Sequence, residues 1–375
     1  MIKESFLEHF VGLNDPRKNN HNKRHELKDI LIITILAVIC GADTWIDIEY
    51  FGKCKQDWLQ KFLTLPNGIP SHDTLNRVFS LLSAKQFEEC FLSWMNSLVE
   101  VSQGEIISID GKTVRGSRGK SKAIHMVSAW ANKNQMVLGQ RKVDGKSNEI
   151  TAVPELLKQL DITDCIITID AMGCQRKIAN QIKEQSADYV LAVKDNQRKL
   201  HQAMKKTFEF AEKKNYEAMV FSEHETVEGD HGRIETRRYV ALPLMYLWQF
   251  KLKWKGLKSL VMVDSERVDK STGEIQKEKR YYISSLSAEA KKLGEAIRLH
   301  WGVENGLHWS LDVSFNEDHN RTRTGNAAEN LSIVRRIALN LLKADKTVKA
   351  GIVTKRKKAG WDHGYLATLL NYSKN

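Results

Sequence analysis

The chain has 375 residues, of which 42% are hydrophobic, and a formal net charge of +12 with a sequence pI of about 9.3. This length provides for two or three globular domains, and the excess of Lys and Arg favours a polyanionic partner, which we expect to be nucleic acid. A membrane partner is not expected, because the sequence shows no clear basic amphipathic helix and no clear lipidation signal. The most apolar run, residues 30–42, is also well short of the roughly twenty residues that span a bilayer as a helix.

The cysteine pattern and the first residues favour a reducing compartment. Five cysteines lack the close spacing of a disulfide framework, and the sequence from Met1 to Ser5 lacks the apolar core of a signal peptide. We therefore expect a cytoplasmic protein that associates with the nucleoid.

Residues 1–104 are predicted to form an all-α, DNA-binding N-terminal domain that is separable from the rest. Apolar residues recur at helical period over residues 30–42, 45–51, 55–63 and 86–99. A Pro/Gly turn over residues 65–70 leads to Ser71, which can cap a helix that carries Arg77. This resembles a helix-turn-helix, although two helices joined by such a turn often only pack together.

Residues 105–345 are predicted to form an α/β catalytic domain. Strands are expected at residues 106–110, 125–131, 136–143, 165–169 and 189–194, with helices at 149–160 and 175–184. The order β-β-β-α-β-α-β is that of a mixed sheet with the ribonuclease H-like fold. Residues 196–287 are interpreted as a β-rich insertion, residues 327–342 as a closing amphipathic helix, and residues 346–375 as a basic C-terminal tail.

Two aspartates follow apolar strands of this domain. Asp110 and Asp170 each precede a Gly-containing turn, where an α/β sheet commonly places ligand groups. Either residue alone could simply start a turn, because Asp is a favoured turn residue. Since the first and fourth strands of this fold are neighbours, we expect the two carboxylates to meet at one edge of the sheet.

A third carboxylate is expected from a polar helix near residue 304. His300, Glu304, His308 and Asp312 stand four residues apart, which places them on one helical face. A solvated, salt-bridged surface would also explain such a face. Three carboxylates can hold two Mg²⁺ ions, with Mn²⁺ able to substitute, and such ions promote phosphodiester cleavage.

Several motifs resemble a known family over nearly the whole chain. They are Gly41 to Trp45, Ile69 to Thr74, Ile109 to Lys112, Ile169 to Ala171, Tyr281 to Leu286, and His300 to Asp318. The chain resembles the H-repeat-associated, insertion-sequence transposases of the DDE type. The resemblance implies a catalytic and metal-binding triad of Asp110, Asp170 and Glu304.

The implied activity is cutting of the element's ends and joining of the 3′-hydroxyls to target DNA. The partners would be double-stranded DNA, as terminal inverted repeats and target, and a second copy of the chain on paired ends. The residues expected to contact DNA are cationic, imidazole or aromatic: Lys112, Arg115, Arg118, Lys194, His231, Arg233, Arg237, Arg298, His300, Trp301, His308, Arg321 and Arg323.

The sequence departs from one pattern of related transposases, Tyr-x2-Arg-x3-Glu-x6-Lys. The corresponding positions are Ile297, His300, Glu304 and Leu311, so only the Glu is retained and phosphate contacts must come from other groups such as Arg298, His300 or His308. Two alternatives stay open. One is a catalytically silent, domesticated DNA-binding protein, and the other is a zinc hydrolase that uses His300, Glu304 and His308.

Overall fold

A computed structural model of the protein describes residues 4–18, 23–99, 102–119, 122–143, 148–230 and 232–370. The chain forms two compact units. Unit 1 comprises Met1–Glu100, Gly111–Lys146 and Glu304–Asn375, and unit 2 comprises Val101–Asp110 and Ser147–Val303. The helices are α1 (Glu4–Glu8), α2 (Leu27–Ile39), α3 (Trp45–Cys54), α4 (Gln56–Leu59), α5 (His72–Leu81), α6 (Ala84–Leu98), α7 (Glu149–Lys158), α8 (Arg176–Glu184), α9 (Arg198–Lys213), α10 (Ala290–His300), α11 (Ala327–Ala344), α12 (Ile352–Trp361) and α13 (His363–Leu370).

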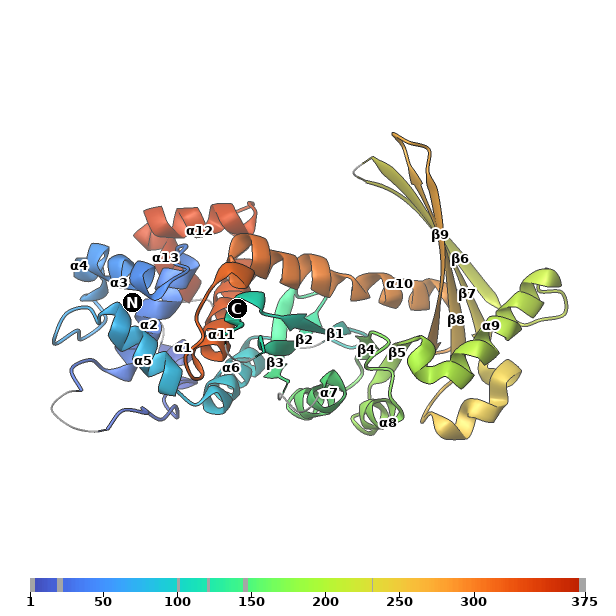
Figure 1. The fold of residues 1–375 in the computed structure, drawn as a ribbon, viewed down its shortest axis with the longest axis horizontal. Helices are drawn as coiled ribbons and strands as arrows, with labels where there is room; N and C mark the ends of the chain where they lie inside the picture. The colour runs from blue at the N-terminus through green and yellow to red at the C-terminus, as the bar shows by residue number, and fades with distance from the viewer. Residues whose placement is uncertain are drawn as a thin grey trace. The chain divides into compact units, whose positions relative to one another are not determined.

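Nine strands of the described chain form one mixed sheet in the order β3-β2-β1-β4-β5-β9-β8-β7-β6 (Figure 1). They are β1 (Ile106–Thr113), β2 (His125–Ala131), β3 (Met136–Lys142), β4 (Ile166–Ile169), β5 (Asp188–Val193), β6 (Ser222–Asp230), β7 (Arg233–Pro243), β8 (Ser259–Asp269) and β9 (Ile275–Ser284). The first five strands have the expected ribonuclease H-like order, with β1, β4 and β5 parallel. This prediction of the fold is confirmed.

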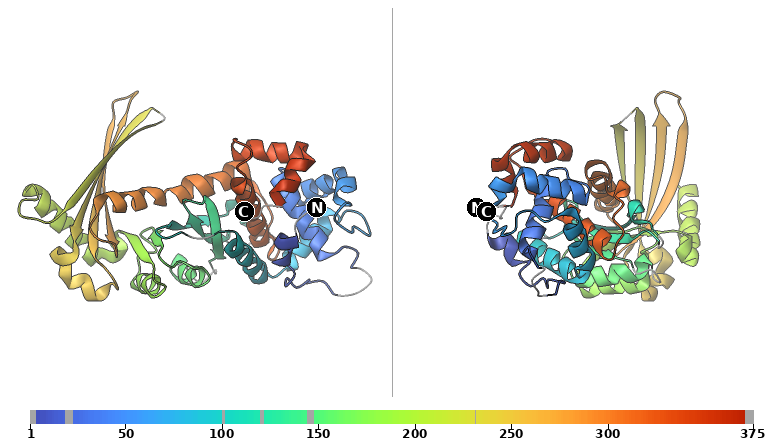
Figure 2. Two further views of the ribbon diagram at one scale, coloured as in Figure 1. Left: turned by 180° about the vertical axis from the view of Figure 1, so that it is seen from behind. Right: turned by 60° about the vertical axis from the view of Figure 1, so that its left-hand side comes forward.

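The parallel strands of unit 2 are covered on both faces. Helices α7 and α8 lie on one face and α10 on the other (Figures 1 and 2). All four residues of β4 are buried, and three of them are isoleucine, which suits a strand without a solvent face. The side chains of α10 and of β7 and β8 form a core that includes Tyr239, Val261 and Leu293.

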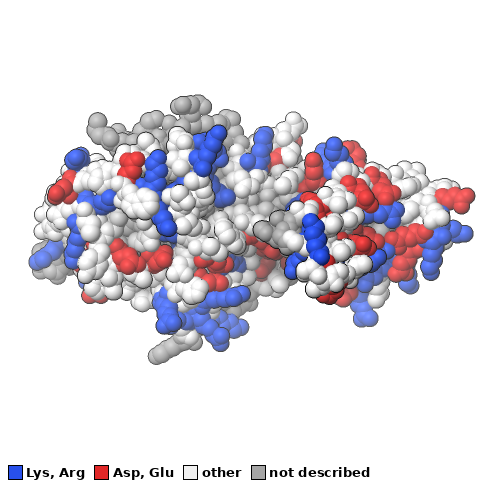
Figure 3. Space-filling model, turned by 90° about the horizontal axis from the view of Figure 1, so that it is seen from above, with Lys and Arg blue, Asp and Glu red and all other residues white. Residues whose placement is uncertain are grey.

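The β-rich insertion continues this sheet. Strand β9 pairs antiparallel with β5, with Ile283 opposite Leu191, and β8, β7 and β6 follow by antiparallel pairing. The long strands carry oppositely charged residues that pair across the sheet, as Lys277 does with Glu266 at 2.8 Å. Figure 3 shows basic and acidic side chains intermixed on the surface that it displays.

Helix α11 lies in the core of unit 1. It contacts α2, α5 and α6, and sixteen of its eighteen residues are buried. The expectation of an amphipathic helix is therefore wrong, because α11 has no solvent face. Some of its buried polar groups form hydrogen bonds within the unit: the Asn330 amide nitrogen donates to the carbonyls of Phe79 at 2.8 Å and Leu82 at 3.0 Å.

Residues 346–370 include two helices, α12 and α13, that belong to unit 1. Lys355 of α12, which was assigned to a basic tail, is buried and donates to the Leu342 carbonyl at 2.9 Å, and it pairs with Asp345 at 3.3 Å. No helix among the described residues is long and apolar enough to cross a membrane.

Candidate active site

Asp110 and Asp170 lie side by side on neighbouring strands. Asp170 follows the last residue of β4, but Asp110 lies within β1, which continues to Thr113, so the expectation that Asp110 ends its strand before a turn is wrong. Strands β1 and β4 pair in parallel with Ile109 opposite Ile169, so the two aspartates are the next residues in register. Neighbouring strands lie about 4.8 Å apart, and residues in register project to the same face. The prediction that the first and fourth strands are neighbours is confirmed.

The turn after β4 holds the Asp170 side chain. Its Oδ1 accepts hydrogen bonds from the backbone N–H groups of Met172 at 3.0 Å and Gly173 at 3.2 Å. Gly173 is required here, because a Cβ at this position would lie 2.2 Å from the Ile169 side chain. Burial raises the pKa of Asp170, and this effect outweighs the two backbone hydrogen bonds.

A chain of polar side chains lies two residues before the aspartates. The Thr168 hydroxyl donates to Ser108 at 3.1 Å, and it also shares a hydrogen bond with His300 Nδ1 at 2.9 Å. Ser108 donates to the Leu299 carbonyl at 3.4 Å. Because residues two apart on a strand project to one face, α10 ends on the face of the sheet that carries Asp110 and Asp170.

His300 is a neutral group in this arrangement. Desolvation by its surroundings lowers the pKa of His300 to about 4, so the imidazole is uncharged at neutral pH. The structure therefore does not support its expected role as a cationic phosphate contact. Instead, His300 anchors the end of α10 to β4, four residues before Glu304.

The acid stability of the protein is expected to depend on His300. Since its folded pKa lies below the unfolded value, its contribution is fully present above about pH 6.5 and is lost as the pH falls toward 4. His300→Gln should remove this part of the acid destabilisation. The measurement is the unfolding temperature against pH, with exposed His319→Gln as control; an unchanged pH profile for His300→Gln would contradict the prediction.

Glu304 opens a segment with π-helical hydrogen bonding. Helix α10 ends at His300, and two π-helical stretches follow, Val303–His308 and Ser310–Ser314. Glu304 itself is exposed. Gly306 fits closely against Trp130, since a Cβ there would lie 2.8 Å from the indole ring. The expected regular α-helix is therefore replaced by a wider one, of the kind often found at functional sites.

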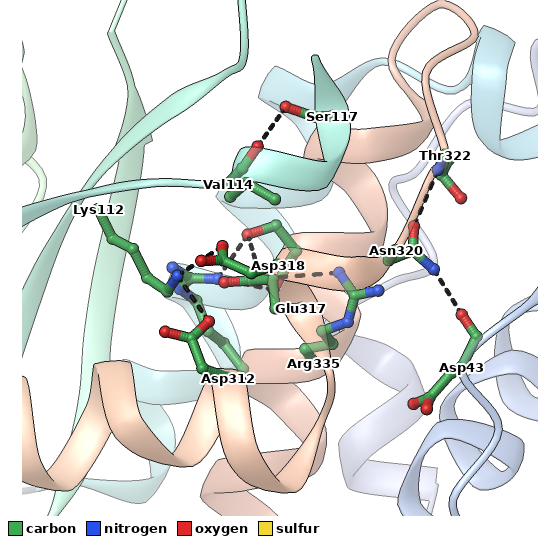
Figure 4. A network of polar contacts seen from close by, with 12 residues as sticks. Asp43, Lys112, Val114, Ser117, Asp312, Glu317, Asp318, Asn320, Thr322 and Arg335 are labelled. Atoms are coloured by element: carbon green, nitrogen blue, oxygen red, sulfur yellow. Dashed lines mark hydrogen bonds and ion pairs between the residues drawn. The ribbon is translucent and has the colours of Figure 1, made fainter. Parts of the chain in front are cut away.

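Lys112 is buried between two aspartates of unit 1 (Figure 4). Its Nζ lies 2.7 Å from Asp312 Oδ1 and 2.9 Å from Asp318 Oδ1. Asp318 also accepts from the backbone N–H of Arg115 at 3.2 Å. Lys112 was expected to contact DNA. This expectation is not supported, because Lys112 is only 7% exposed and its ammonium group is already paired with two aspartates.

The loop after β1 brings other predicted cations of unit 1 together. Gly116 fits against the chain near Asn320, whose carbonyl oxygen would lie 2.1 Å from an added Cβ. Arg323 donates from Nε to the Gly116 carbonyl at 3.2 Å. Arg115, Arg118, Arg321 and Arg323 are exposed. These four arginines remain candidates for phosphate contact.

The candidate DNA contacts in unit 2 fall into two groups: Arg237, Arg298 and Trp301 already contact other side chains, whereas Lys194 and Arg233 are exposed. Arg237 and Arg298 both pair with Glu228, at 2.9 and 3.0 Å, and the Arg280 guanidinium lies over the Trp301 ring at 5.0 Å. His308, in unit 1, is half-buried, and His231 lies outside the described residues.

The donor chemistry of the aspartate pair fits a hard cation. Two carboxylates in register on neighbouring strands offer the oxygen ligands that Mg²⁺ and Mn²⁺ prefer. Within the described residues, no three His, Cys, Asp or Glu side chains are placed to hold one ion together. This holds for the alternative zinc ligands His300, Glu304 and His308 and equally for the three carboxylates Asp110, Asp170 and Glu304.

Sequence reasoning missed Ser108 and Thr168 and the pairing of Lys112. A signal was present for the first two: each is a polar residue inside an apolar strand, two positions before an aspartate. For Lys112 the sequence offers no comparable signal, because its partners are 200 and 206 residues away (312 − 112 and 318 − 112).

Comparison with known proteins gives consistent matches. Residues 102–341 match the family model described as Transposase DDE domain, and residues 7–95 match DDE_Tnp_1-associated. The chain is 47% identical to "Putative transposase YncI" of Escherichia coli O157:H7, over 99% of this chain and 95% of that protein. It is 45% identical to "H repeat-associated putative transposase YhhI" of Escherichia coli strain K12, over 99% of this chain and 98% of that protein.

Among solved structures, the chain is similar to a piggyBac transposase synaptic complex with hairpin DNA. The identity is 11% and the TM-score 0.48, with 99% of this chain and 77% of that chain covered. The family is established by the sequence matches, which extend over nearly the full length of the chain. On these matches, and with its ribonuclease H-like strand order, the chain belongs to the DDE transposase family.

Proposed function

We propose that the protein is a DNA transposase that cuts the ends of its own element and joins the freed 3′-hydroxyls to target DNA. The observation that carries this proposal is the register of β1 and β4, which makes Asp110 and Asp170 neighbours on adjacent strands. A former transposase that only binds DNA would not need both carboxylates side by side, so we favour the active enzyme.

Asp110, Asp170 and Glu304 are the proposed catalytic residues. Asp110 and Asp170 lie beside each other in unit 2. Glu304 comes four residues after His300, which anchors α10 to β4. Bound Mg²⁺ or Mn²⁺ ions would activate the attacking oxygen and stabilise the leaving oxygen of the phosphodiester. The task of the three carboxylates is to hold negative charge at fixed positions, and Ser108, Thr168 and His300 keep the supporting backbone in place.

DNA is the proposed partner, as element ends and as target. The net charge of +12 and the exposed Arg115, Arg118, Arg321 and Arg323 support contacts to the phosphate backbone. Lys194 and Arg233 are further exposed candidates from unit 2. We propose a homodimer on paired DNA ends, acting on DNA of the nucleoid.

Cleavage of element ends by the purified protein tests the proposal. The substrate is a labelled duplex that contains the inverted repeat flanking the open reading frame, and the expected result is 3′-end cleavage that requires Mg²⁺ or Mn²⁺ and stops with EDTA. A shuffled duplex controls for specificity. Specific binding without cleavage in either metal would instead identify the protein as a silent DNA-binding relative.

A further inference from the structure

Strand β1 is contacted by a residue that precedes Glu304 in the sequence and by a residue that follows it. Within unit 2, Ser108 of β1 donates to the Leu299 carbonyl of α10. Within unit 1, Lys112 of the same strand pairs with Asp312 of the second π-helical stretch. In sequence, Asp110 lies between Ser108 and Lys112, and Glu304 lies between Leu299 and Asp312.

The second contact is made by a buried charge. Lys112 projects from the same face of β1 as Asp110, because the two residues are two apart on one strand. Its ammonium lies 2.7 Å from Asp312 and 2.9 Å from Asp318 (Figure 4). A charge taken out of water is costly unless it is paired, so this lysine holds both aspartates firmly.

Asp318 is fixed in turn by the loop after β1. It accepts a hydrogen bond from the Arg115 backbone N–H, and the adjoining Glu317 pairs with buried Arg336 at 3.3 Å. The segment after Glu304 is thus tied at Asp312 and at Asp318 to the end of β1 and the residues that follow it.

We infer that Lys112 is a positioning residue that, with Asp312 and Asp318, fixes the segment that carries Glu304 to the end of β1 and so orients the Glu304 carboxylate for the metal ion that it is proposed to hold. The inference rests on the proposed function, in which Glu304 is a metal ligand. Lys112 contacts neither DNA nor the reacting atoms in this role. Its effect passes through the two segments that it joins.

The direction of the effect on cation binding separates this role from simple electrostatics. If Lys112 acted only through its charge, its removal would leave two aspartates unpaired and tighten the binding of a divalent cation. If Lys112 positions Glu304, its removal weakens binding, and loss of a residue that orients metal ligands typically costs roughly 10–100-fold in metal affinity or activity. The two roles therefore predict opposite signs.

The experiment measures Mn²⁺ binding to the full-length, DNA-free protein by electron paramagnetic resonance of the free ion. Lys112→Met should weaken Mn²⁺ binding by roughly tenfold or more, and Lys112→Arg, which keeps the charge, should recover most of the affinity. Asp312→Asn, which removes a partner and keeps the shape, should weaken binding in the same direction. Element-end cleavage should need correspondingly more Mg²⁺ in Lys112→Met, while DNA affinity stays close to that of the parent.

Lys355→Met is the matched control. Lys355 is also buried in unit 1 and paired with one aspartate, Asp345 at 3.3 Å, but its partners Leu342 and Asp345 lie outside β1 and outside the segment that carries Glu304. Lys355→Met should lower the unfolding temperature and leave the Mn²⁺ affinity unchanged, when both variants are measured at a temperature where they are folded.

Three outcomes would overturn the inference: parental or tighter Mn²⁺ binding in Lys112→Met, equal weakening in Lys355→Met, or a loss of DNA affinity in Lys112→Met with a reduced salt dependence. The last would make Lys112 a phosphate contact. Failure of the proposed function looks different, because the parent protein itself would then neither bind Mn²⁺ at Asp110 and Asp170 nor cleave DNA. Mn²⁺ binding abolished in Asp110→Asn identifies the site.

Discussion

Asp170→Asn is expected to abolish strand cleavage and, in metal-free protein at pH 8, to raise the unfolding temperature. The amide oxygen of Asn can still accept the hydrogen bonds that Met172 and Gly173 donate to Oδ1, so the turn is kept and only the charge is lost. Loss of a metal ligand removes several kcal/mol of transition-state stabilisation, which corresponds to roughly a thousandfold or more in the cleavage rate.

The stability gain follows from the raised pKa of Asp170. A carboxyl group whose pKa is higher in the folded than in the unfolded protein favours folding below its unfolded pKa, and this contribution is lost as the pH rises through the folded pKa. At pH 8 the buried carboxylate therefore opposes folding. The gain from Asp170→Asn should shrink as the pH is lowered toward the unfolded pKa of Asp, about 3.9.

Asp188→Asn is the control for both measurements. Asp188 is the first residue of β5, a strand next to β4, and lies at the end of that strand opposite to the Asp170 end. Burial raises the pKa of Asp188, but hydrogen bonds from Lys183 and Ser285 lower it by more, so the net shift of the pKa is downward. This variant should cleave DNA and should be less stable than the parent at pH 8. Cleavage by Asp170→Asn at the parental rate in Mg²⁺ would remove Asp170 from the proposed triad. The same result for Asp110→Asn or Glu304→Gln would remove Asp110 or Glu304.

The sheet and the aspartate pair could be predicted because their signals are local. A strand such as Ile166–Ile169 is buried on both faces and is recognisable as a short apolar run, and Asp170 marks its end. The strand order then follows from the fold that this succession of elements is typical of. The placement of Asp110 beside Asp170 needs only the register of two parallel strands.

The geometry around Glu304 could not be predicted, because it depends on contacts between distant residues. Spacing by four indicates a helix but does not distinguish α-helical from π-helical hydrogen bonding, and the close fit of Gly306 to Trp130 is a tertiary contact. A lysine among arginines similarly predicted a basic loop. Burial of Lys112 between Asp312 and Asp318 reversed that interpretation.

The helices before Gly104 looked separable for a related reason. Helical period identifies their apolar faces but not what covers them. In unit 1 the covering element is α11, more than two hundred residues later in the chain, and α11 is itself buried among α2, α5 and α6. A boundary that is visible in composition therefore need not be a boundary between cores.

Deletion of residues 1–99 is expected to unfold unit 1, whereas the pattern of the sequence alone predicted that the catalytic domain would keep its fold. All but one of the thirteen residues of α2 are buried, and each buried Leu or Ile contributes about 1.5–3 kcal/mol, so the loss exceeds the roughly 5–15 kcal/mol by which most proteins are stable. The deletion also leaves the buried Asn330 amide without the Phe79 and Leu82 carbonyls.

Hydrogen exchange of the 100–375 fragment measures this effect element by element. Amides of α11 and β3 should lose protection, whereas those of β5 and β9 in unit 2 should keep it, because the two groups belong to different compact units. Co-expression of residues 1–99 as a separate chain should restore protection of α11, since the lost contacts are non-covalent.

A monomeric 100–375 fragment with fully protected α11 amides would show that the N-terminal helices are separable, and recognition of the element's ends could then be assigned by deletion. Otherwise it must be assigned by surface substitutions such as Arg77→Ala, which remove an exposed side chain of α5 without opening the core.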